Sequence, residues 1–166
     1  MNLYLSVKVE GVSRQIRALT NFLAIKNIRY CYNDNISSYK DLKDTYCRSN
    51  GIVYIKQSIE SGEVFCGSHH LNDLVRVVHD HTHIKFGFDF SVTGELNTAL
   101  YTHIELRSRV SKDLNDLIFI DTVSQIYYYN RYKKYVADQD TFLRDICQRI
   151  TVSSLEEMKN QIMEVI

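Results

Sequence analysis

Residues 71–96, with the sequence LNDLVRVVHDHTHIKFGFDFSVTGEL, decide how this chain is organised. Their apolar side chains recur at helical spacing, and the short loop GFDFS separates this pattern from a second helical one. Because the loop is short, we expect the two helices to pack antiparallel. From here to the C-terminus the pattern predicts helices at about 71–86, 92–109, 113–136, 139–150 and 154–165. Ser153 and Glu156 form a capping-box signature for the last helix.

The residues before this segment alternate between helical and strand patterns. Residues 12–26 carry apolar side chains at helical spacing, and residues 39–51 predict a shorter helix that ends at Gly51. Three stretches predict strands: IRYCYN (28–33), IVYIKQ (52–57) and SGEVFCGS (61–68). We therefore expect a single α+β domain over residues 1–166. Its mixed portion (1–68) would hold a small sheet of about two to four strands with one or two helices, and its remaining half (69–166) would be helical.

Composition and charge are those of an ordinary globular protein. Hydrophobic residues make up 45% of the 166 residues, and the 20 basic residues balance the 20 acidic ones. A net charge of zero predicts no bulk attraction to nucleic acid or to an anionic membrane, although a local patch can still exist. No apolar run approaches the roughly 20 residues that span a bilayer, and the N-terminus does not resemble a signal peptide. These features predict a cytoplasmic protein without a membrane partner.

Three histidines alternate in the first of the two helices, with an aspartate among them. At 100° per residue His79 and His83 project from one face, which they share with Asp80 and Arg76, whereas His81 points toward the flank of the apolar side. Imidazoles four residues apart are the pair by which a helix offers two ligands to one metal ion. The alternative is a polar helix face in contact with water.

Two further polar residues interrupt apolar surroundings on the following helices. His103 lies within the apolar sector of its helix, so its ring nitrogens need a partner, which is most often a carbonyl, a carboxylate or water. Asp121 interrupts the apolar run DLIFIDTVSQI, and a carboxylate there needs a partner or a place at the helix margin. We expect His103 to approach His79 and His83 around a polar cavity, with Asp121 as a secondary ligand.

The order of several residues in this region resembles the HD…H…FG…GE block of the HD-superfamily phosphohydrolases, especially the deoxyguanosine triphosphate triphosphohydrolases. The matching residues are His79-Asp80, His83, Phe86-Gly87 and Gly94-Glu95. In that family the histidine–aspartate dyad binds a divalent metal, and the later histidine lies beside the phosphate. The resemblance therefore implies a metal on His79 and Asp80. The block covers about twenty residues, and His81-Thr82 stands where the family usually has Ile-Gly.

A longer part of the chain is similar to small uncharacterised proteins of tailed bacteriophages. This similarity rests on LVRVVHDHTH and GFDFSVTGE, preceded by NIRYCYN and IVYIKQ. It implies an origin in the host cytoplasm during infection and no particular activity. Small phage proteins often bind and block host enzymes or defence factors. The alternative of a non-enzymatic protein that binds and inhibits a host enzyme or defence factor therefore stays open.

As an enzyme, this chain would be a metal-dependent phosphohydrolase acting on a nucleotide or a phosphodiester. The candidate ligands of one divalent ion are His79, Asp80, His83, His103 and Asp121. Mixed histidine and aspartate ligation suits Mn, Fe, Co, Ni or Zn. Glu95 would act as general base or orient a ligand histidine, and Arg76 would pair with a phosphate oxygen. A zinc peptidase is a poorer match, because such enzymes carry glutamate where Asp80 stands.

The segment YYYNRYKKYV, residues 127–136, supports a third function. Its tyrosines flank Arg131, Lys133 and Lys134, and aromatic rings beside cations can stack on the bases of a nucleic acid. Binding of that kind would depend steeply on salt. The alternative is a helix whose tyrosines pack with their hydroxyls in water. We expect packing to be their main contribution.

Overall fold

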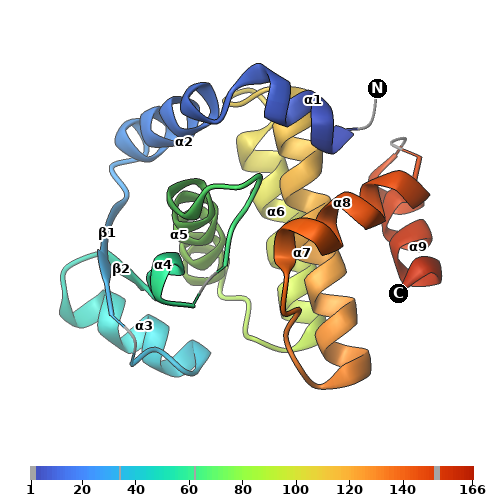
Figure 1. Cartoon of the computed structure of the whole chain (residues 1–166). Helices are drawn as coiled ribbons and strands as arrows, with labels where there is room; N and C mark the ends of the chain where they lie inside the picture. Colours follow the sequence, from blue (N-terminus) through green and yellow to red (C-terminus); the bar gives the residue numbers. More distant parts are fainter. Residues whose placement is uncertain (1–2, 34, 62, 152–153) are drawn as a thin grey trace.

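The computed structural model describes residues 3–33, 35–61, 63–151 and 154–166 (Figure 1). In chain order the elements are α1 (Leu3–Glu10), α2 (Val12–Ile25), β1 (Arg29–Tyr32), α3 (Tyr39–Arg48), β2 (Ile52–Ile55), α4 (Ser58–Ser61), α5 (His69–Phe86), α6 (Val92–Leu106), α7 (Lys112–Tyr132), α8 (Gln139–Arg149) and α9 (Leu155–Val165). The chain is mostly helical with one small sheet near its N-terminus, so the predicted helical C-terminal part is confirmed. No helix in the described part of the chain is both long and apolar enough to cross a membrane.

The sheet consists of two parallel strands in the described ranges. β1 pairs with β2 in a register that sets Arg29 opposite Ile52, and α3 forms the connection between the strands. Val53 and Ile55 of β2 are buried, and this strand packs against α5. The sheet therefore supports one side of α5.

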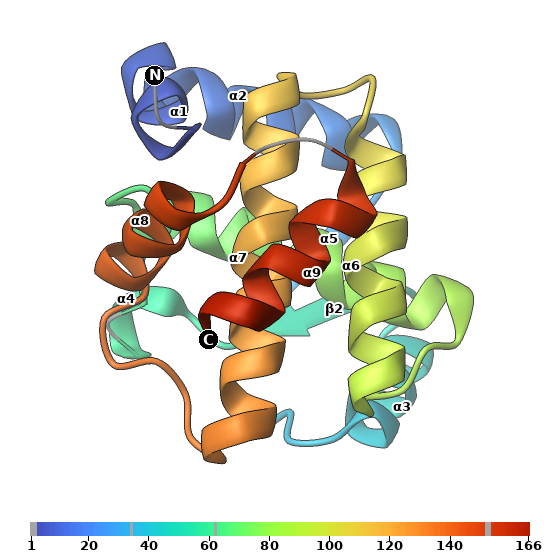
Figure 2. The same ribbon diagram turned by 90° about the vertical axis from the view of Figure 1, so that its right-hand side faces the viewer.

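Helix α5 occupies the middle of the molecule (Figure 1). It contacts α2, α3, α4 and β2 on one side and α6 on the other. Figure 2 shows α6 and α7 side by side, with α9 lying across them. Because α5 is covered on two sides, the face that carries His79 and His83 is largely buried: His83 has no exposed surface, whereas His79 stays partly exposed.

Helix α6 crosses α5 instead of returning along it, so the prediction of antiparallel packing is wrong (Figures 1 and 2). Glu95 meets His79, Thr98 meets His83, and Glu105 meets Lys85, so residue numbers rise together along both helices. The loop between the helices causes this arrangement, because it carries the chain back toward His79 before α6 begins.

Two glycines shape this loop. Gly87 has φ of 73°, a left-handed conformation that ends α5 and lets the amides of Gly87 and Phe88 donate to the His83 carbonyl, at 2.9 and 3.1 Å. Gly94 lies in the first turn of α6, where a Cβ would overlap the carbonyl oxygen of Asp89. Ser91 caps the same turn by accepting a hydrogen bond from the Gly94 amide at 3.1 Å.

Residues 61–68 do not form the predicted third strand. Ser61 ends α4, and Phe65 and Ser68 form an isolated bridge around a tight turn, while Gly62 lies outside the described residues. Cys66 and Gly67 inside the turn have φ of 52° and 76°. Left-handed residues of this kind are incompatible with a strand, so the short apolar run here forms a buried turn.

The last helices differ from prediction at their ends. α7 ends at Tyr132, because Lys133 takes a left-handed conformation with φ of 53°. The capping box of α9 is formed by Ser154 and Glu157, one residue later than predicted, while Ser153 lies outside the described residues.

Helix α1 is an element that the sequence pattern did not predict. Its apolar residues alternate in the manner of a strand, yet Leu3, Tyr4 and Val7 are buried against α7 and α8. Tertiary packing thus decides its conformation.

Candidate metal centre

Two histidines of α5 and one glutamate of α6 bring three donor atoms together. His79 Nε2 lies 3.0 Å from Glu95 Oε2 and 3.0 Å from His83 Nε2, and His83 Nε2 lies 3.3 Å from Glu95 Oε2. Among the described residues, these three form the one group of histidine, cysteine and acidic side chains close enough to share a metal ion. The i, i+4 spacing on α5 aligns the imidazoles, and the crossing of α6 supplies the carboxylate.

The environment of His83 determines which ring nitrogen faces the cluster. His83 Nδ1 lies 2.9 Å from the carbonyl oxygen of Phe88 and 3.1 Å from Thr98 Oγ1, whose hydroxyl donates to the Gly94 carbonyl. A carbonyl accepts only, so Nδ1 carries the proton and donates it. In neutral His83 the Nε2 lone pair then points at His79 and Glu95, which is the tautomer that binds metal.

Aromatic side chains close the other sides of the His83 ring. The ring of Phe90 lies edge-on with its centroid 4.9 Å away, and Tyr39 lies 6.4 Å away. Both come from segments outside α5, so the imidazole is fixed by packing as well as by hydrogen bonds.

The three donors need a positive charge among them. Burial on its own would raise the pKa of the Glu95 carboxyl, but hydrogen bonds with His79 and His83 lower this pKa to about 2. Burial opposes charge on His83, but its hydrogen bond with Glu95 raises the pKa of this imidazole above the ordinary value. A shared proton or a metal ion satisfies the same set of lone pairs.

The spacing fits a metal ion. Nitrogen and oxygen ligands bind divalent first-row ions at about 2.0–2.2 Å, so neighbouring ligands lie about 3 Å apart at the right angles of an octahedral site and about 3.3–3.6 Å apart in a tetrahedral zinc site. The separations of 3.0, 3.0 and 3.3 Å are closer to the octahedral spacing. Two imidazoles and one carboxylate on one side of an ion leave positions open for water or a substrate.

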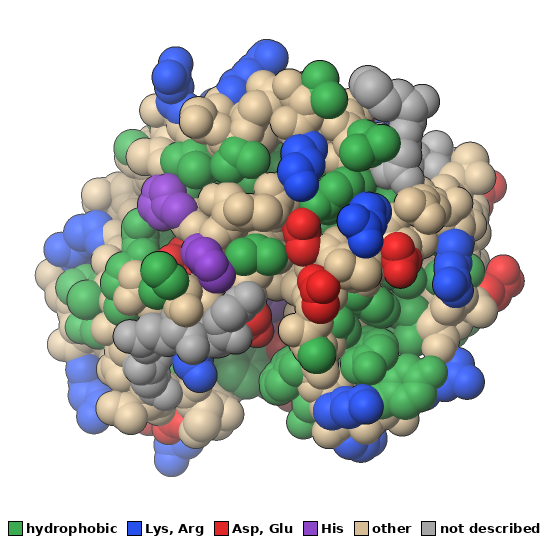
Figure 3. All heavy atoms as spheres, viewed as in Figure 1, with side chains coloured by type: hydrophobic (Ala, Val, Ile, Leu, Met, Phe, Trp, Pro, Cys, Tyr) green, Lys and Arg blue, Asp and Glu red, His purple; other side chains and the backbone are tan. Residues whose placement is uncertain are grey.

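The open side of the cluster faces a cavity of about 800 Å³, to which His79 and Glu95 both contribute. The face in Figure 3 is hollowed below its centre, between the side formed by α3 and α4 and the C-terminal end of α7. Three basic side chains line this cavity: Lys56, Arg76 and Lys133. Arg76 also forms an ion pair with Glu63 at 2.7 Å.

Asp80 follows His79 but does not join the three donors. Its carboxyl is half-buried, and burial raises its pKa, an effect that the positive charges of His79 and Arg76 oppose in part. In the structure Glu95 occupies the place beside the histidine pair that the HD resemblance assigns to Asp80.

His103 does not converge with His79 and His83, in contrast to the prediction. Its Nε2 pairs with Asp116 Oδ1 at 3.0 Å, and Lys112 binds the other oxygen of Asp116 at 2.5 Å. The crossing of the helices explains this difference, because α6 has already passed α5 where His103 occurs and this residue faces α7.

Asp121 lines the same cavity as His79 and Glu95, without belonging to the cluster. Its Oδ2 accepts hydrogen bonds from Gln125 and Gln139, each at 2.9 Å. Burial raises the pKa of Asp121 to about 7, although these hydrogen bonds favour the ionised form. The side-chain amides of Gln125 and Gln139 are therefore the partners that a carboxylate in this apolar run needs.

Sequence reasoning missed Phe88 and Thr98, which position His83. Phe88 acts through its backbone carbonyl, for which no residue type gives a signal. Gly87 is the available clue, since a glycine after a helical pattern predicts the left-handed turn that brings this carbonyl back. His81 lies away from the cluster, with its ring 6.5 Å from that of Tyr46.

The tyrosines near the end of α7 divide into two groups. Tyr128 packs against Tyr132 and Phe142, with ring centroids 4.7 and 5.3 Å away, and the Tyr132 hydroxyl donates to the Ile166 carbonyl at 3.1 Å. The rings of Tyr129 and Tyr135 pack against each other at a tilt, with centroids 4.8 Å apart, and both line the cavity.

Comparisons of the chain with protein-family models, with curated proteins and with solved structures gave no match. The similarities to HD-superfamily phosphohydrolases and to small phage proteins therefore stay predictions.

Proposed function

We propose that this protein is a metal-dependent phosphohydrolase that acts on a nucleotide or a phosphodiester. The proposal is carried by one observation, the convergence of two imidazoles and a carboxylate on the wall of an open cavity of about 800 Å³. This donor set suits Mn, Fe, Co, Ni or Zn, and the volume lies in the range of pockets that bind small molecules.

Hydrolysis requires a nucleophile and neutralisation of phosphate charge. A divalent ion on His79, His83 and Glu95 would lower the pKa of a bound water and offset negative charge on the phosphate. Glu95 would then be a metal ligand and not a general base, because its pKa of about 2 keeps it ionised and makes it a weak base.

Residues around the cavity can orient a bound nucleotide. Arg76 and Lys133 line the cavity together with Glu95, so both can contact a phosphate bound beside it. Arg76 would exchange its ion pair with Glu63 for a phosphate oxygen. Tyr129 and Tyr135 offer aromatic surface within the same cavity for the base of a nucleotide.

The test is hydrolysis of deoxynucleoside triphosphates and of bis(p-nitrophenyl) phosphate, measured after chelator treatment and again after addition of Mn²⁺ or Zn²⁺. We expect activity only with metal, and its loss in His79→Ala and Glu95→Gln. His81→Ala is the matched control, because it removes a histidine of the same helix outside the cluster. It should retain wild-type activity.

Two results would contradict the proposal. One is equal hydrolysis by wild type and His79→Ala, and the other is cleavage of peptide substrates with no cleavage of phosphate esters. A protein that neither binds metal nor hydrolyses phosphate esters would instead favour the prediction of a non-enzymatic partner of a host protein.

A further inference from the structure

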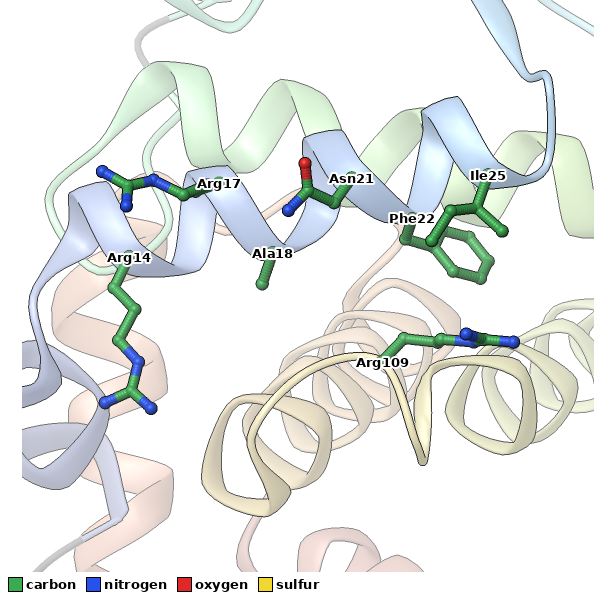
Figure 4. A pocket seen from close by; sticks show the side chains of 7 residues that line it. All are labelled: Arg14, Arg17, Ala18, Asn21, Phe22, Ile25 and Arg109. Atoms are coloured by element: carbon green, nitrogen blue, oxygen red, sulfur yellow. The ribbon is translucent and has the colours of Figure 1, made fainter.

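A second cavity, of about 360 Å³, lies between α2 and the turn that joins α6 to α7. Figure 4 shows its side chains, with Arg14 and Arg17 on α2 and Arg109 on the turn below Phe22 and Ile25. The lining residues are Arg14, Arg17, Ala18, Asn21, Phe22, Ile25 and Arg109. Three of these carry positive charge and none is acidic. We call this site the arginine groove.

The three arginines of the groove make no interaction that the fold requires. Arg14, Arg17 and Arg109 are exposed, and within the described residues their guanidinium groups have no hydrogen bond or ion pair. Arg76, by contrast, is paired with Glu63. Three unpaired cations around one hollow repel one another, and an anionic ligand would relieve this repulsion.

We infer that the arginine groove binds the phosphate backbone of a nucleic-acid duplex without reading its sequence. The guanidinium groups do not converge on one point, since those of Arg14 and Arg17 lie toward one end of α2 and that of Arg109 lies under the other (Figure 4). The helical rise of about 1.5 Å per residue separates positions 14 and 25 by roughly 16 Å. A single phosphate cannot reach all three cations, whereas a row of phosphates can.

The chemistry of the groove favours a duplex over other polyanions. Proteins that bind single strands offer aromatic rings on which bases stack. Phe22 is the one aromatic among the described lining residues, and it is only 1% exposed. Duplex DNA carries one charge for every 1.7 Å or so of its axis, about twice the density of an extended acidic peptide, and arginine pairs with phosphate in a bidentate manner.

This inference is independent of the proposed function. Glu95 lies in the first turn of α6, whereas Arg109 follows the opposite end of that helix. The groove also differs from the tyrosine segment, because Arg131, Lys133 and Lys134 do not line it.

The experiment is a titration of the full chain into a fluorescently labelled duplex of mixed sequence, read by anisotropy at salt concentrations from about 50 to 200 mM. The triple variant Arg14→Gln, Arg17→Gln, Arg109→Gln should bind at least tenfold more weakly at the lowest salt. The slope of log K against log salt should become shallower by about 2.7, since each phosphate contact contributes about 0.9. Each single variant should change it by about 0.9.

The matched control is the triple variant Arg48→Gln, Arg144→Gln, Arg149→Gln, which removes the same charge from exposed positions outside both the groove and the tyrosine segment. It should bind the duplex as the wild type does, and thermal melts should show that both triple variants are folded. The inference is overturned if the groove variant binds the duplex as tightly as wild type, or if the control variant loses as much affinity. Tighter binding of a single strand or of polyglutamate than of the duplex would also overturn it.

Discussion

Helix α6 carries two histidine–carboxylate contacts of equal length in very different surroundings. Glu95 meets His79 at 3.0 Å, and His103 meets Asp116 at 3.0 Å. The Asp116 pair is completed by the ammonium group of Lys112, so its negative charge is already balanced. The Glu95 group instead contains a second imidazole and faces a cavity. A short histidine–carboxylate distance alone therefore does not distinguish a candidate metal centre from a structural ion pair, whereas a third donor atom and an adjoining cavity do.

We expect the largest effect from a substitution at Gly94, where α6 starts next to the loop that brings Glu95 to His79 and His83. A methyl group at Gly94 would overlap the carbonyl of Asp89 and force the start of α6 away from α5. We expect Gly94→Ala to lower the free energy of unfolding by about 3 kcal/mol and to weaken metal binding. Chemical denaturation measures the first effect and isothermal titration the second. Unchanged stability would mean that the loop packs less closely than the structure indicates.

Thr98 contacts His83 but not the His103–Asp116 pair, so its substitution should change metal binding without affecting that pair. Thr98→Val removes a partner of His83 Nδ1 with little change in volume, and we expect metal affinity to fall by about ten- to a hundredfold. Thr102→Val is the control, because the Thr102 hydroxyl bonds to Thr82 and not to the cluster. Equal losses in the two variants would assign the effect to packing in α6.

The dependence of metal binding on pH should follow His83. A metal requires neutral imidazole, and the pKa of His83 is raised by its hydrogen bond with Glu95 against the opposing effect of burial. Affinity should therefore fall as pH decreases through the raised pKa of His83, by about tenfold per pH unit for one displaced proton. Titrations with Zn²⁺ or Mn²⁺ between pH 8 and about pH 6 test this. A flat profile would argue against imidazole ligands.

The smallest effect on stability should come from a substitution in the His103–Asp116 pair. His103→Ala removes one partner of Asp116 but leaves Lys112 in place, so we expect a loss of about 1 kcal/mol of stability. Metal affinity should not change. Thermal unfolding measures the stability and titration of the same sample measures the metal affinity. Any loss of metal binding would indicate that His103 contributes to the metal centre.

Periodicity was enough to predict α2, α3 and the helices from α5 onward, together with the alignment of His79 with His83, because these depend on local spacing along one helix. The crossing of α5 and α6 could not be predicted, since it depends on the path of five loop residues and on packing against distant elements. The partners of Glu95 and His103 follow from that crossing. For the same reason the pattern pointed to Asp80 and His103 as ligands, whereas Glu95 lies beside the pair.

Tertiary packing also decides the secondary structure of helix α1 and of the turn at residues 65–68. The pattern predicts a strand over residues 61–68, and the apolar residues of α1 alternate in a manner typical of strands. Leu3, Tyr4 and Val7 are buried by packing against α7 and α8, and two left-handed residues turn the chain after Phe65. Short segments follow their tertiary contacts more than their own pattern.

The most direct test of the metal centre is elemental analysis after dialysis against a slight excess of Mn²⁺ or Zn²⁺, carried out on three proteins. Wild type and Asp116→Asn should each retain about one ion per chain, whereas Glu95→Gln should retain almost none, because the amide loses the charge that holds the ion. Retention of metal by Glu95→Gln, or its absence from the wild type, would contradict the account.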